Sequence, residues 1–245
     1  MQASQLVDGE RERDLVLEHN TSITAEYEMK ADQIAHGPGD YDFTASDRIV
    51  DFAETNGLQV RGHALLWYRT TPDFFLTGTR DEIRTKLQDY ITAVVSRYRG
   101  RVQVWDVVNE AVTDNATDAT APYRDDAWFA AVGSDYLAWA FEAARAADPD
   151  AKLFINDYGT ENADKRERYV AIIRDLLDAG VPLDGVGHQM HLNHTRTVDD
   201  VEAALDAVAA FGCGPYAADH GTRHLRLQRS GHLLGVGGRM PAELW

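Results

Sequence analysis

Apolar and polar residues recur along the chain with two alternating periods. Short runs rich in valine, isoleucine and leucine are typical of strands that are covered on both faces. Longer segments, in which apolar residues return on one face of a helix, separate these runs. The runs predict strands at residues 22–26, 58–67, 102–110, 152–156 and 185–189. The longer segments predict helices at residues 10–20, 44–57, 79–98, 134–147, 163–179 and 198–211.

This alternation predicts an α/β fold, in which helices cover a parallel sheet. Such a sheet is either closed into a (β/α)8 barrel or open and doubly wound. Open sheets of this kind commonly hold a nucleotide on a glycine-rich loop after a strand. No predicted strand has such a loop, because Gly37-Pro-Gly39 lies between polar segments. The barrel is therefore favoured, although 245 residues allow one large domain or two smaller ones.

Polar side chains stand at the carboxyl ends of the predicted strands. They are Glu26, His63, Asn109, Glu110, Asn156, Asp157, Gln189 and His191. In a barrel these ends converge on one face, where barrel enzymes carry their active sites. The convergence predicts a functional site. Taken alone, Glu110 is better explained as the first solvated residue after a core strand.

The charge of the chain narrows the range of partners. It has 24 Lys and Arg against 40 Asp and Glu, a formal net charge of -16. Nucleic acid and anionic membranes need a basic face, so a neutral or basic ligand is expected instead. The single Cys213 excludes an intramolecular disulfide framework. No segment has the length and apolarity of a transmembrane helix, and residues 1–4 lack the regions of a signal peptide.

The predicted strand that ends in Asn109 and Glu110 carries the strongest chemical signal. A buried carboxylate is costly unless it is used or paired. Amides, imidazoles and tryptophans around a carboxylic acid suit a carbohydrate, whose hydroxyls they bind and whose faces they cover. Glycosidic bonds are cleaved by a pair of carboxyl groups, one of which acts as an acid. The pattern therefore favours carbohydrate chemistry without a cofactor.

Zinc binding is an alternative interpretation of the histidines. The candidates are His63, His188, His191 and His194. None of them forms the i, i+4 helical pair with a flanking glutamate that is typical of zinc enzymes, and Cys213 has no partner. No metal is therefore expected.

Other residues near Glu110 have structural explanations. Trp67 and Trp105 lie within predicted strands, so each taken singly is a core or barrel-wall residue rather than a platform for a sugar. Asp106 points opposite to Val107 in the strand alternation, and its neutral explanation is a satisfied structural carboxylate.

Five motifs then occur in a fixed order over roughly residues 1–212. They are Thr24-Ala-Glu-Tyr-Glu-Met-Lys30, Arg61-Gly-His-Ala-Leu-Leu-Trp67, Trp105-Asp-Val-Val-Asn-Glu110, Phe154-Ile-Asn-Asp-Tyr158 and Gly185-Val-Gly-His-Gln-Met-His-Leu192. Together they resemble glycoside hydrolase family 10, the endo-1,4-β-xylanases. The resemblance implies a (β/α)8 barrel that hydrolyses β-1,4-xylosidic linkages in xylan or xylo-oligosaccharides with retention, as a secreted monomer without cofactor or metal.

The resemblance also implies a role for each motif residue. Glu110 would be the acid/base that protonates the leaving oxygen and later activates water. Asn109 would bond the sugar 2-hydroxyl. Sugars on the non-reducing side of the cut would be held by Glu26, Lys30 and His63. The nucleophile would be oriented by Gln189 and His191. Trp67 and Tyr158 complete the implied substrate-binding set.

Two positions depart from the family pattern. Tyr27 stands where the family has Asn, and Tyr68-Arg69-Thr70 stands where it usually has His-x-Gln. These changes alter the sugar contacts and leave the acid/base untouched.

The second carboxylate of the family is missing from the expected place. Retaining chemistry needs it about 5 Å from the first, and in the family it lies in a Thr-Glu-Leu-Asp motif on the seventh strand. After Gly212 the chain has no such motif. The composition changes there as well, because residues 213–245 have four Arg against one Asp and one Glu, whereas residues 1–212 carry a charge of -18.

The codons of Asp219 to Arg229 offer an explanation. Read one base later, bases that encode this segment permit Ile-Thr-Glu-Leu-Asp-Ile-Ser-Val-Tyr-Ser-Asp, the nucleophile strand of the family. We therefore expect that the chain is out of frame from about residue 213. The missing glutamate would be encoded across the codons of Gly221 and Thr222.

The expected fold is thus an incomplete barrel. Residues 1–212 would form the partial catalytic barrel, with most of strand one missing and strands seven and eight absent, and residues 213–245 would be a disordered tail. The expected function is xylan hydrolysis by descent, impaired in this chain by the absent nucleophile. A non-catalytic protein that binds xylo-oligosaccharides and a hydrolase of another β-glycan stay open as alternatives.

Overall fold

The computed structural model describes residues 1–209, 211 and 214–217. Its main feature is a six-stranded sheet in the order β1-β4-β5-β6-β7-β8, in which every neighbouring pair is parallel. The strands are β1 (Ser22–Thr24), β4 (Gln59–Trp67), β5 (Val104–Asn109), β6 (Lys152–Asp157), β7 (Gly185–His188) and β8 (Gly214–Ala217). A small antiparallel pair, β2 (Ala35–Gly37) and β3 (Asp40–Tyr41), stands apart from this sheet.

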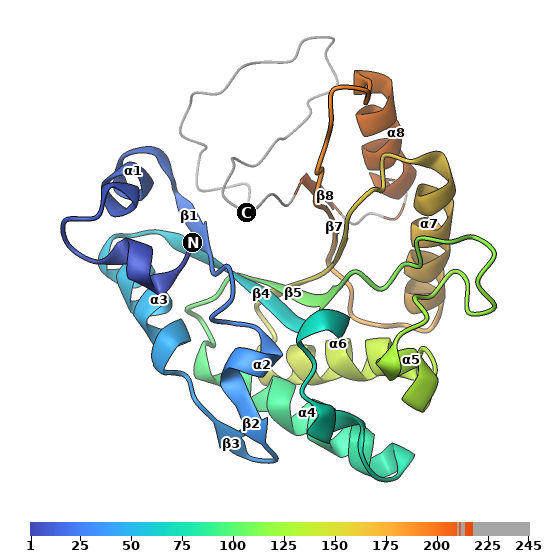
Figure 1. Cartoon of the computed structure of the whole chain (residues 1–245), viewed down its shortest axis with the longest axis horizontal. Coiled ribbons are helices and arrows are strands. Elements are labelled where there is room, and N and C mark those ends of the chain that lie inside the picture. The colour runs from blue at the N-terminus through green and yellow to red at the C-terminus, as the bar shows by residue number, and fades with distance from the viewer. Residues whose placement is uncertain (210, 212–213, 218–245) are drawn as a thin grey trace.

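Helices follow the strands and form an arc around them (Figure 1). The α-helices are α1 (Arg11–His19), α2 (Ala31–Ile34), α3 (Thr44–Thr55), α4 (Arg80–Arg97), α5 (Ala127–Val132), α6 (Asp135–Ala147), α7 (Ala163–Asp178) and α8 (Val198–Ala209). Short 3-10 turns occur at η1 (Ala3–Leu6), η2 (Tyr68–Thr70) and η3 (Asp73–Leu76). Within the described ranges, no helix is both long and apolar enough to cross a membrane.

Helix α4 shows how the sequence sets these elements. Thr79 caps its first turn, because the Thr79 hydroxyl accepts a hydrogen bond from the Glu82 N–H at 3.3 Å and the Glu82 carboxylate accepts one from the Thr79 N–H at 2.7 Å. This reciprocal pair satisfies donors that a helix start leaves open. Ile83, Leu87 and Ile91 recur on the buried face. The helix is therefore fixed at its start and along one side.

The core lies between the sheet and the helices, with β5 at its centre. Trp105 is fully buried, which confirms its assignment to the barrel wall. A Cβ atom at Gly62 would lie 2.1 Å from the Trp105 ring, so only glycine on β4 allows the indole to pack against that strand.

At the β1 edge of the sheet, Met1 lies beside the strand. Its amino group donates to the carbonyl oxygen of Thr24 at 2.8 Å, and its carbonyl oxygen accepts from the Glu26 N–H at 2.9 Å. Met1 therefore pairs with β1 as the end of a neighbouring strand would. This is the position at which most of strand one was expected to be missing.

The predicted fold class, an incomplete α/β barrel, is confirmed, and one detail differs. No strand was expected after residue 212, whereas Gly214–Ala217 forms β8 and pairs with Gly185–His188. The physical reason is that the backbone N–H and C=O groups at the edge of β7 are satisfied when a parallel segment pairs with them. The expected absence of an eighth strand and the expected disorder of residues 218–245 lie outside the described residues.

Candidate active site

Glu110 directly follows β5 and is fixed through both of its backbone groups. Its N–H donates to the carbonyl oxygen of Asn156 at 2.8 Å, and its carbonyl oxygen accepts from Arg124 Nε at 2.7 Å. Its φ of 63° lies in the left-handed region, which residues other than glycine rarely enter and which is common at functional sites. Only 8% of the residue is exposed, so the interpretation of Glu110 as a solvated strand end is wrong.

Two donors from different strands hold the Glu110 carboxylate. Trp67 Nε1, at the end of β4, donates to Oε2 at 2.9 Å, and Gln189 Nε2, just after β7, donates to Oε1 at 3.1 Å. Each oxygen therefore has one donor, which compensates in part for its burial. The carboxyl group is oriented from both sides.

Asn109 is fixed by the same group of side chains. Its Oδ1 accepts from Asn156 Nδ2 at 3.0 Å and from Gln189 Nε2 at 3.1 Å. Both of these contacts occupy the amide oxygen. The amide NH2 group is therefore the part of Asn109 that is suited to donate to a ligand.

Below these residues lies a buried charge cluster around Asp106. Arg61 Nε donates to Asp106 Oδ2 at 2.9 Å and Arg61 Nη2 bonds the other oxygen, while His63 Nδ1 lies 2.9 Å from Oδ2. Burial alone would raise the pKa of Asp106, but Arg61 and His63 hold it well below its ordinary value. Asp106 is thus the satisfied structural carboxylate that the strand alternation suggested, and it orients His63.

Lys30 lies near Trp67, Tyr27 and the backbone of Glu26. Its Nζ donates to the carbonyl oxygen of Glu26 and lies 5.5 Å from the centre of the Trp67 ring and 4.8 Å from that of Tyr27. Burial lowers the pKa of Lys30, although Glu26 and Glu110 among other acidic groups oppose this shift. The ammonium group of Lys30 is therefore partly desolvated and lies near two aromatic rings and Glu110.

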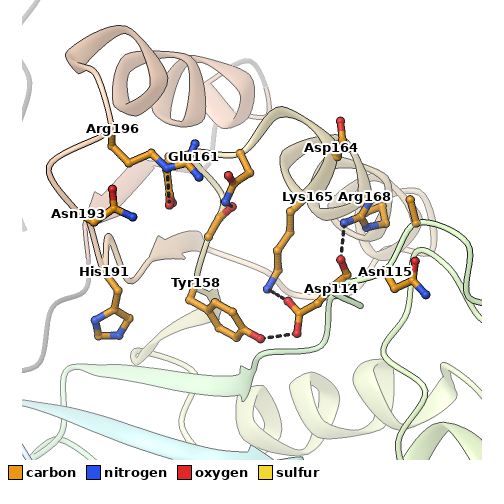
Figure 2. A pocket seen from close by; sticks show the side chains of 13 residues that line it. Asp114, Asn115, Tyr158, Glu161, Asp164, Lys165, Arg168, His191, Asn193 and Arg196 are labelled. Atoms are coloured by element: carbon orange, nitrogen blue, oxygen red, sulfur yellow. Dashed lines mark hydrogen bonds and ion pairs between the residues drawn. The ribbon is translucent and has the colours of Figure 1, made fainter.

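Tyr158 and His191 line a cleft of about 660 Å³ that does not have Glu110 in its wall (Figure 2). Its lining residues are Asp114, Asn115, Ala116, Tyr158, Gly159, Glu161, Asn162, Asp164, Lys165, Arg168, His191, Asn193 and Arg196. The Asp114 carboxylate accepts hydrogen bonds from Lys165 Nζ at 2.7 Å and from the Tyr158 hydroxyl. Although burial raises it, these two hydrogen bonds bring the pKa of Asp114 down to about 2.

Lys165 joins this cleft to the end of β6. Its Nζ lies 2.9 Å from Asp157 Oδ1, and the second oxygen of Asp157 accepts from the Val112 N–H at 3.0 Å. Burial raises the pKa of Asp157 to about 6 even though Lys165 opposes this. Asp157 therefore holds the segment after β5 in place through its hydrogen bond with the backbone of Val112.

Arg124 forms hydrogen bonds both with Glu110 and with residues that line the cleft. Its Nε donates to the Glu110 carbonyl oxygen at 2.7 Å, its Nη2 to the Tyr158 hydroxyl at 3.3 Å and its Nη1 to Asp114 at 3.1 Å. Sequence patterns did not single out Arg124, Asp114 or Lys165. They lie outside the strands, and their partners are distant along the chain, so no local signal exists for them.

Comparison with known proteins places the chain in a family. The sequence profile described as Glycosyl hydrolase family 10 matches residues 1–216. The chain belongs to glycosyl hydrolase family 10. The resemblance predicted from the five motifs is confirmed.

Two curated relatives of this family 10 chain are xylanases. Endo-1,4-beta-xylanase B of Paenibacillus barcinonensis is 39% identical over 207 residues, which cover 82% of this chain and 61% of that protein. Beta-1,4-xylanase of Dictyoglomus thermophilum is 44% identical over 177 residues, which cover 72% of this chain and 49% of that protein. The chain therefore spans less than two thirds of the length of either relative.

Solved family 10 structures share the fold. The GH10 structure from Paenibacillus barcinonensis superimposes with a TM-score of 0.82 at 35% identity, covering 88% of this chain and 66% of that one. An intracellular xylanase from Thermoanaerobacterium saccharolyticum superimposes with a TM-score of 0.83 at 32% identity, covering 88% of this chain and 69% of that one. A mutant of the latter has been solved in complex with xylotriose.

The structure places the predicted family 10 site residues in two groups. The first is hydrogen-bonded or packed around the acid and consists of Glu110, Asn109, Gln189, Trp67 and Lys30, with His63 beneath. The second lines the cleft and consists of Tyr158 and His191. Glu26 contributes its carbonyl oxygen to Lys30, and its carboxylate lies 3.4 Å from Gln2 Nε2.

In the part of the chain that the structure describes, no group of three or more His, Cys, Asp or Glu side chains is arranged to hold a metal ion. His63 instead contacts Asp106, and His188 Nδ1 lies 2.8 Å from the hydroxyl of Thr160.

His188 makes the stability of this family 10 chain sensitive to pH. It is fully buried at the end of β7, and burial lowers the pKa of His188 to about 4. The unfolded chain takes up this proton near pH 6.5, so the folded state loses stability as the pH falls from about 6.5 towards 4. In His188→Gln we expect that loss to be smaller by roughly 3 kcal/mol. Urea unfolding from pH 7 to pH 4 measures it, and parallel curves for the two proteins would contradict the prediction.

Proposed function

We propose that the chain binds xylan and xylo-oligosaccharides across the carboxyl ends of its strands, and that Glu110 is the acid/base of retaining endo-hydrolysis of β-1,4-xylosidic linkages. The observation that carries this proposal is the Glu110 carboxyl group, buried at a strand end and held by Trp67 and Gln189 beside Asn109. Xylan is the proposed polymer because the relatives described above are xylanases by name.

With Glu110 as the acid/base, retaining hydrolysis would proceed in two steps. Glu110 gives a proton to the glycosidic oxygen while the bond from that oxygen to the anomeric carbon breaks and a second carboxylate attacks the carbon. The Glu110 carboxylate then takes a proton from water, whose oxygen attacks the anomeric carbon and displaces the second carboxylate. The NH2 group of Asn109 donates a hydrogen bond to the 2-hydroxyl of the sugar. This hydrogen bond strengthens as charge develops on the sugar in the transition state.

We propose that the described residues do not supply the second carboxylate. Asp106 and Asp157, the carboxylates on the two central strands, are buried and bound to Arg61 and Lys165, so neither is suited to attack a sugar. We propose that the nucleophile is encoded out of frame, across the codons of Gly221 and Thr222, and that turnover by the present chain is impaired for this reason. Residues 217–245, beyond the family match, are then a segment without a family counterpart.

Replacing the acid tests the assignment of Glu110. In Glu110→Gln the remaining amide oxygen still accepts from Trp67, so binding of xylotriose should stay within about threefold of the unmutated chain. Any release of reducing ends from xylohexaose should fall to the level of a blank, because an amide transfers no proton. Calorimetry measures the first and chromatography of labelled xylohexaose at high protein concentration measures the second.

A matched control is Glu142→Gln, an exposed glutamate on helix α6. It should change neither quantity. Release of reducing ends that survives Glu110→Gln would show that Glu110 is not the acid, and a chain that binds no xylo-oligosaccharide would contradict the proposal as a whole.

A second function, xylo-oligosaccharide binding without hydrolysis, is favoured by one observation. Lys30, His63, Asn109 and Gln189 are all held in place, so the sugar-binding half of the site does not need the missing carboxylate. Binding by the unmutated chain with no detectable release of reducing ends identifies this function. Comparing xylohexaose with cellohexaose tests the further alternative of another β-glycan.

The place of action follows from the size of the substrate. Polymeric xylan does not enter a cell, so we place activity on xylan outside it, whereas one solved relative is described as intracellular. Immunodetection of the protein in the medium and in washed cells tests this placement.

A further inference from the structure

Arg69 lies at one of the two departures from the family pattern, in the turn that follows β4. It comes two residues after Trp67, whose indole donates to the Glu110 carboxylate. Arg69 Nε donates to the Tyr68 hydroxyl at 2.8 Å, and its guanidinium carbon lies 5.4 Å from the Tyr68 ring centre and 5.9 Å from that of Trp67. The residue is exposed. An arginine supported by aromatic rings therefore faces solvent beside the proposed acid.

The charge of Arg69 is not neutralised by a neighbouring acid. Elsewhere on this acidic protein Arg80, Arg97 and Arg101 pair with aspartate or glutamate. Among the residues that the structure describes, Arg69 has no carboxylate within ion-pair distance and its two Nη groups donate no hydrogen bond. Both Nη groups are therefore available to donate to a ligand.

A second arginine lies near the same tyrosine ring. The guanidinium carbon of Arg124 is 4.7 Å from the Tyr68 ring centre, so Tyr68 contacts both guanidinium groups. Arg124 is in turn bound to the Glu110 carbonyl oxygen and to Asp114. The hydrogen bond to Tyr68 raises the pKa of Arg69, and the nearby charge of Glu110 raises it further. Arg69 is thus held in place, permanently charged and close to the acid.

We propose that Arg69 binds the carboxylate of a hexuronic acid branch on xylan, through its two Nη groups, and that it selects acidic over neutral branches. The proposal rests on the function proposed above. A carboxylate matches the planar fork of a guanidinium, which the neutral His-x-Gln of the family does not offer. The xylose backbone itself is neutral, so a carboxylate that reaches Arg69 beside the scissile bond must belong to a branch. The exposed position leaves room for it.

Calorimetric titration with three xylo-oligosaccharides of equal backbone length tests the proposal. One is unbranched, one has a single glucuronic acid branch, and one has the same branch after its carboxyl group has been reduced to the alcohol. The acidic ligand should bind the unmutated chain about fivefold or more tightly than the reduced ligand. This preference should vanish in Arg69→Gln and weaken at high salt, since the pair is exposed to solvent.

The matched control is Arg84→Gln. Arg84 is also exposed and lies 5.4 Å from the ring centre of a tryptophan, Trp139, but it is on helix α4 away from the strand ends. It should leave the preference intact, and thermal melting shows that both variants fold. Equal affinity for the acidic and reduced ligands, or a preference that survives Arg69→Gln, overturns the role of Arg69 while leaving xylan binding in place. If none of the three ligands binds, the proposed function fails as well.

Discussion

Deleting one base of the gene between codons 212 and 219 is expected to raise the rate of xylan hydrolysis by at least about 10⁴-fold, because the loss of an enzymatic nucleophile costs that much or more. The deletion makes the ribosome read the downstream bases in the frame that permits Ile-Thr-Glu-Leu-Asp. The glutamate of this motif then supplies the attacking carboxylate. Release of reducing ends from xylan by the edited and unedited proteins measures the effect.

The physical reason lies in the present half of the site. Hydrogen bonds link the side chains of Glu110, Trp67, Asn109 and Gln189. These side chains are therefore positioned without the second carboxylate. In addition, the edge of β7 already accepts a parallel strand, β8. The in-frame sequence, which begins at the codons of Asp219, can therefore continue the strand that already pairs with β7.

Two controls separate the reading frame from the length of the chain. Deleting three bases at the same place keeps the present frame and should restore nothing. The edited protein with glutamine at its new glutamate should be as inactive as the present chain. A stop codon in the shifted frame, or no glutamate codon across those of Gly221 and Thr222, would exclude the explanation without an assay.

The second large effect concerns stability. Replacing Asp106 by alanine is expected to lower the free energy of unfolding by about 3 to 5 kcal/mol, the usual cost of removing one partner of a buried ion pair. Asp106 is 1% exposed, and its removal leaves the buried Arg61 guanidinium without its counter-charge. It also removes the contact that orients His63. Urea unfolding at pH 7, followed by tryptophan fluorescence, measures the change.

An exposed ion pair provides the comparison. The side chains of Arg80 and Asp135 are 49% and 56% exposed, so Asp135→Ala should cost less than about 1 kcal/mol. If Asp106→Ala costs as little as Asp135→Ala, the cluster below the site contributes no net stability and the interpretation of Asp106 as a structural carboxylate is wrong.

The regular part of the fold was predictable because its periodicity is strong. The helix predicted at 163–179 is α7 (Ala163–Asp178), and the strand predicted at 152–156 is β6 (Lys152–Asp157). The segment from Ala31 to Tyr41 was not predicted, because α2, β2 and β3 have four residues or fewer and depend on their packing. β8 was not predicted either, since its four residues, Gly-Pro-Tyr-Ala, lack the apolar pattern of a strand.

The candidate site divides in the same way. Glu110, Asn109 and Gln189 lie at the carboxyl ends of strands. A parallel sheet brings these ends together, so the alternation of strands and helices in the sequence predicts that the three residues are close. Arg124 and Lys165 lie in a loop and on a helix, and their contacts with Glu110 and Asp114 span many residues. Only the folded chain shows that they tie the cleft to the acid.

The left-handed backbone of Glu110 has a consequence for the history of the gene. The φ of 63° at Glu110 carries backbone strain that glycine at the same place would relieve, although Trp67 and Gln189 would then lose their acceptor. Once a chain no longer cuts its substrate, nothing selects against that exchange, and stabilising substitutions are expected to accumulate there early. Glu110 and its partners are nevertheless intact. If the frame changed in nature, it therefore changed recently compared with the time that such a site needs to decay.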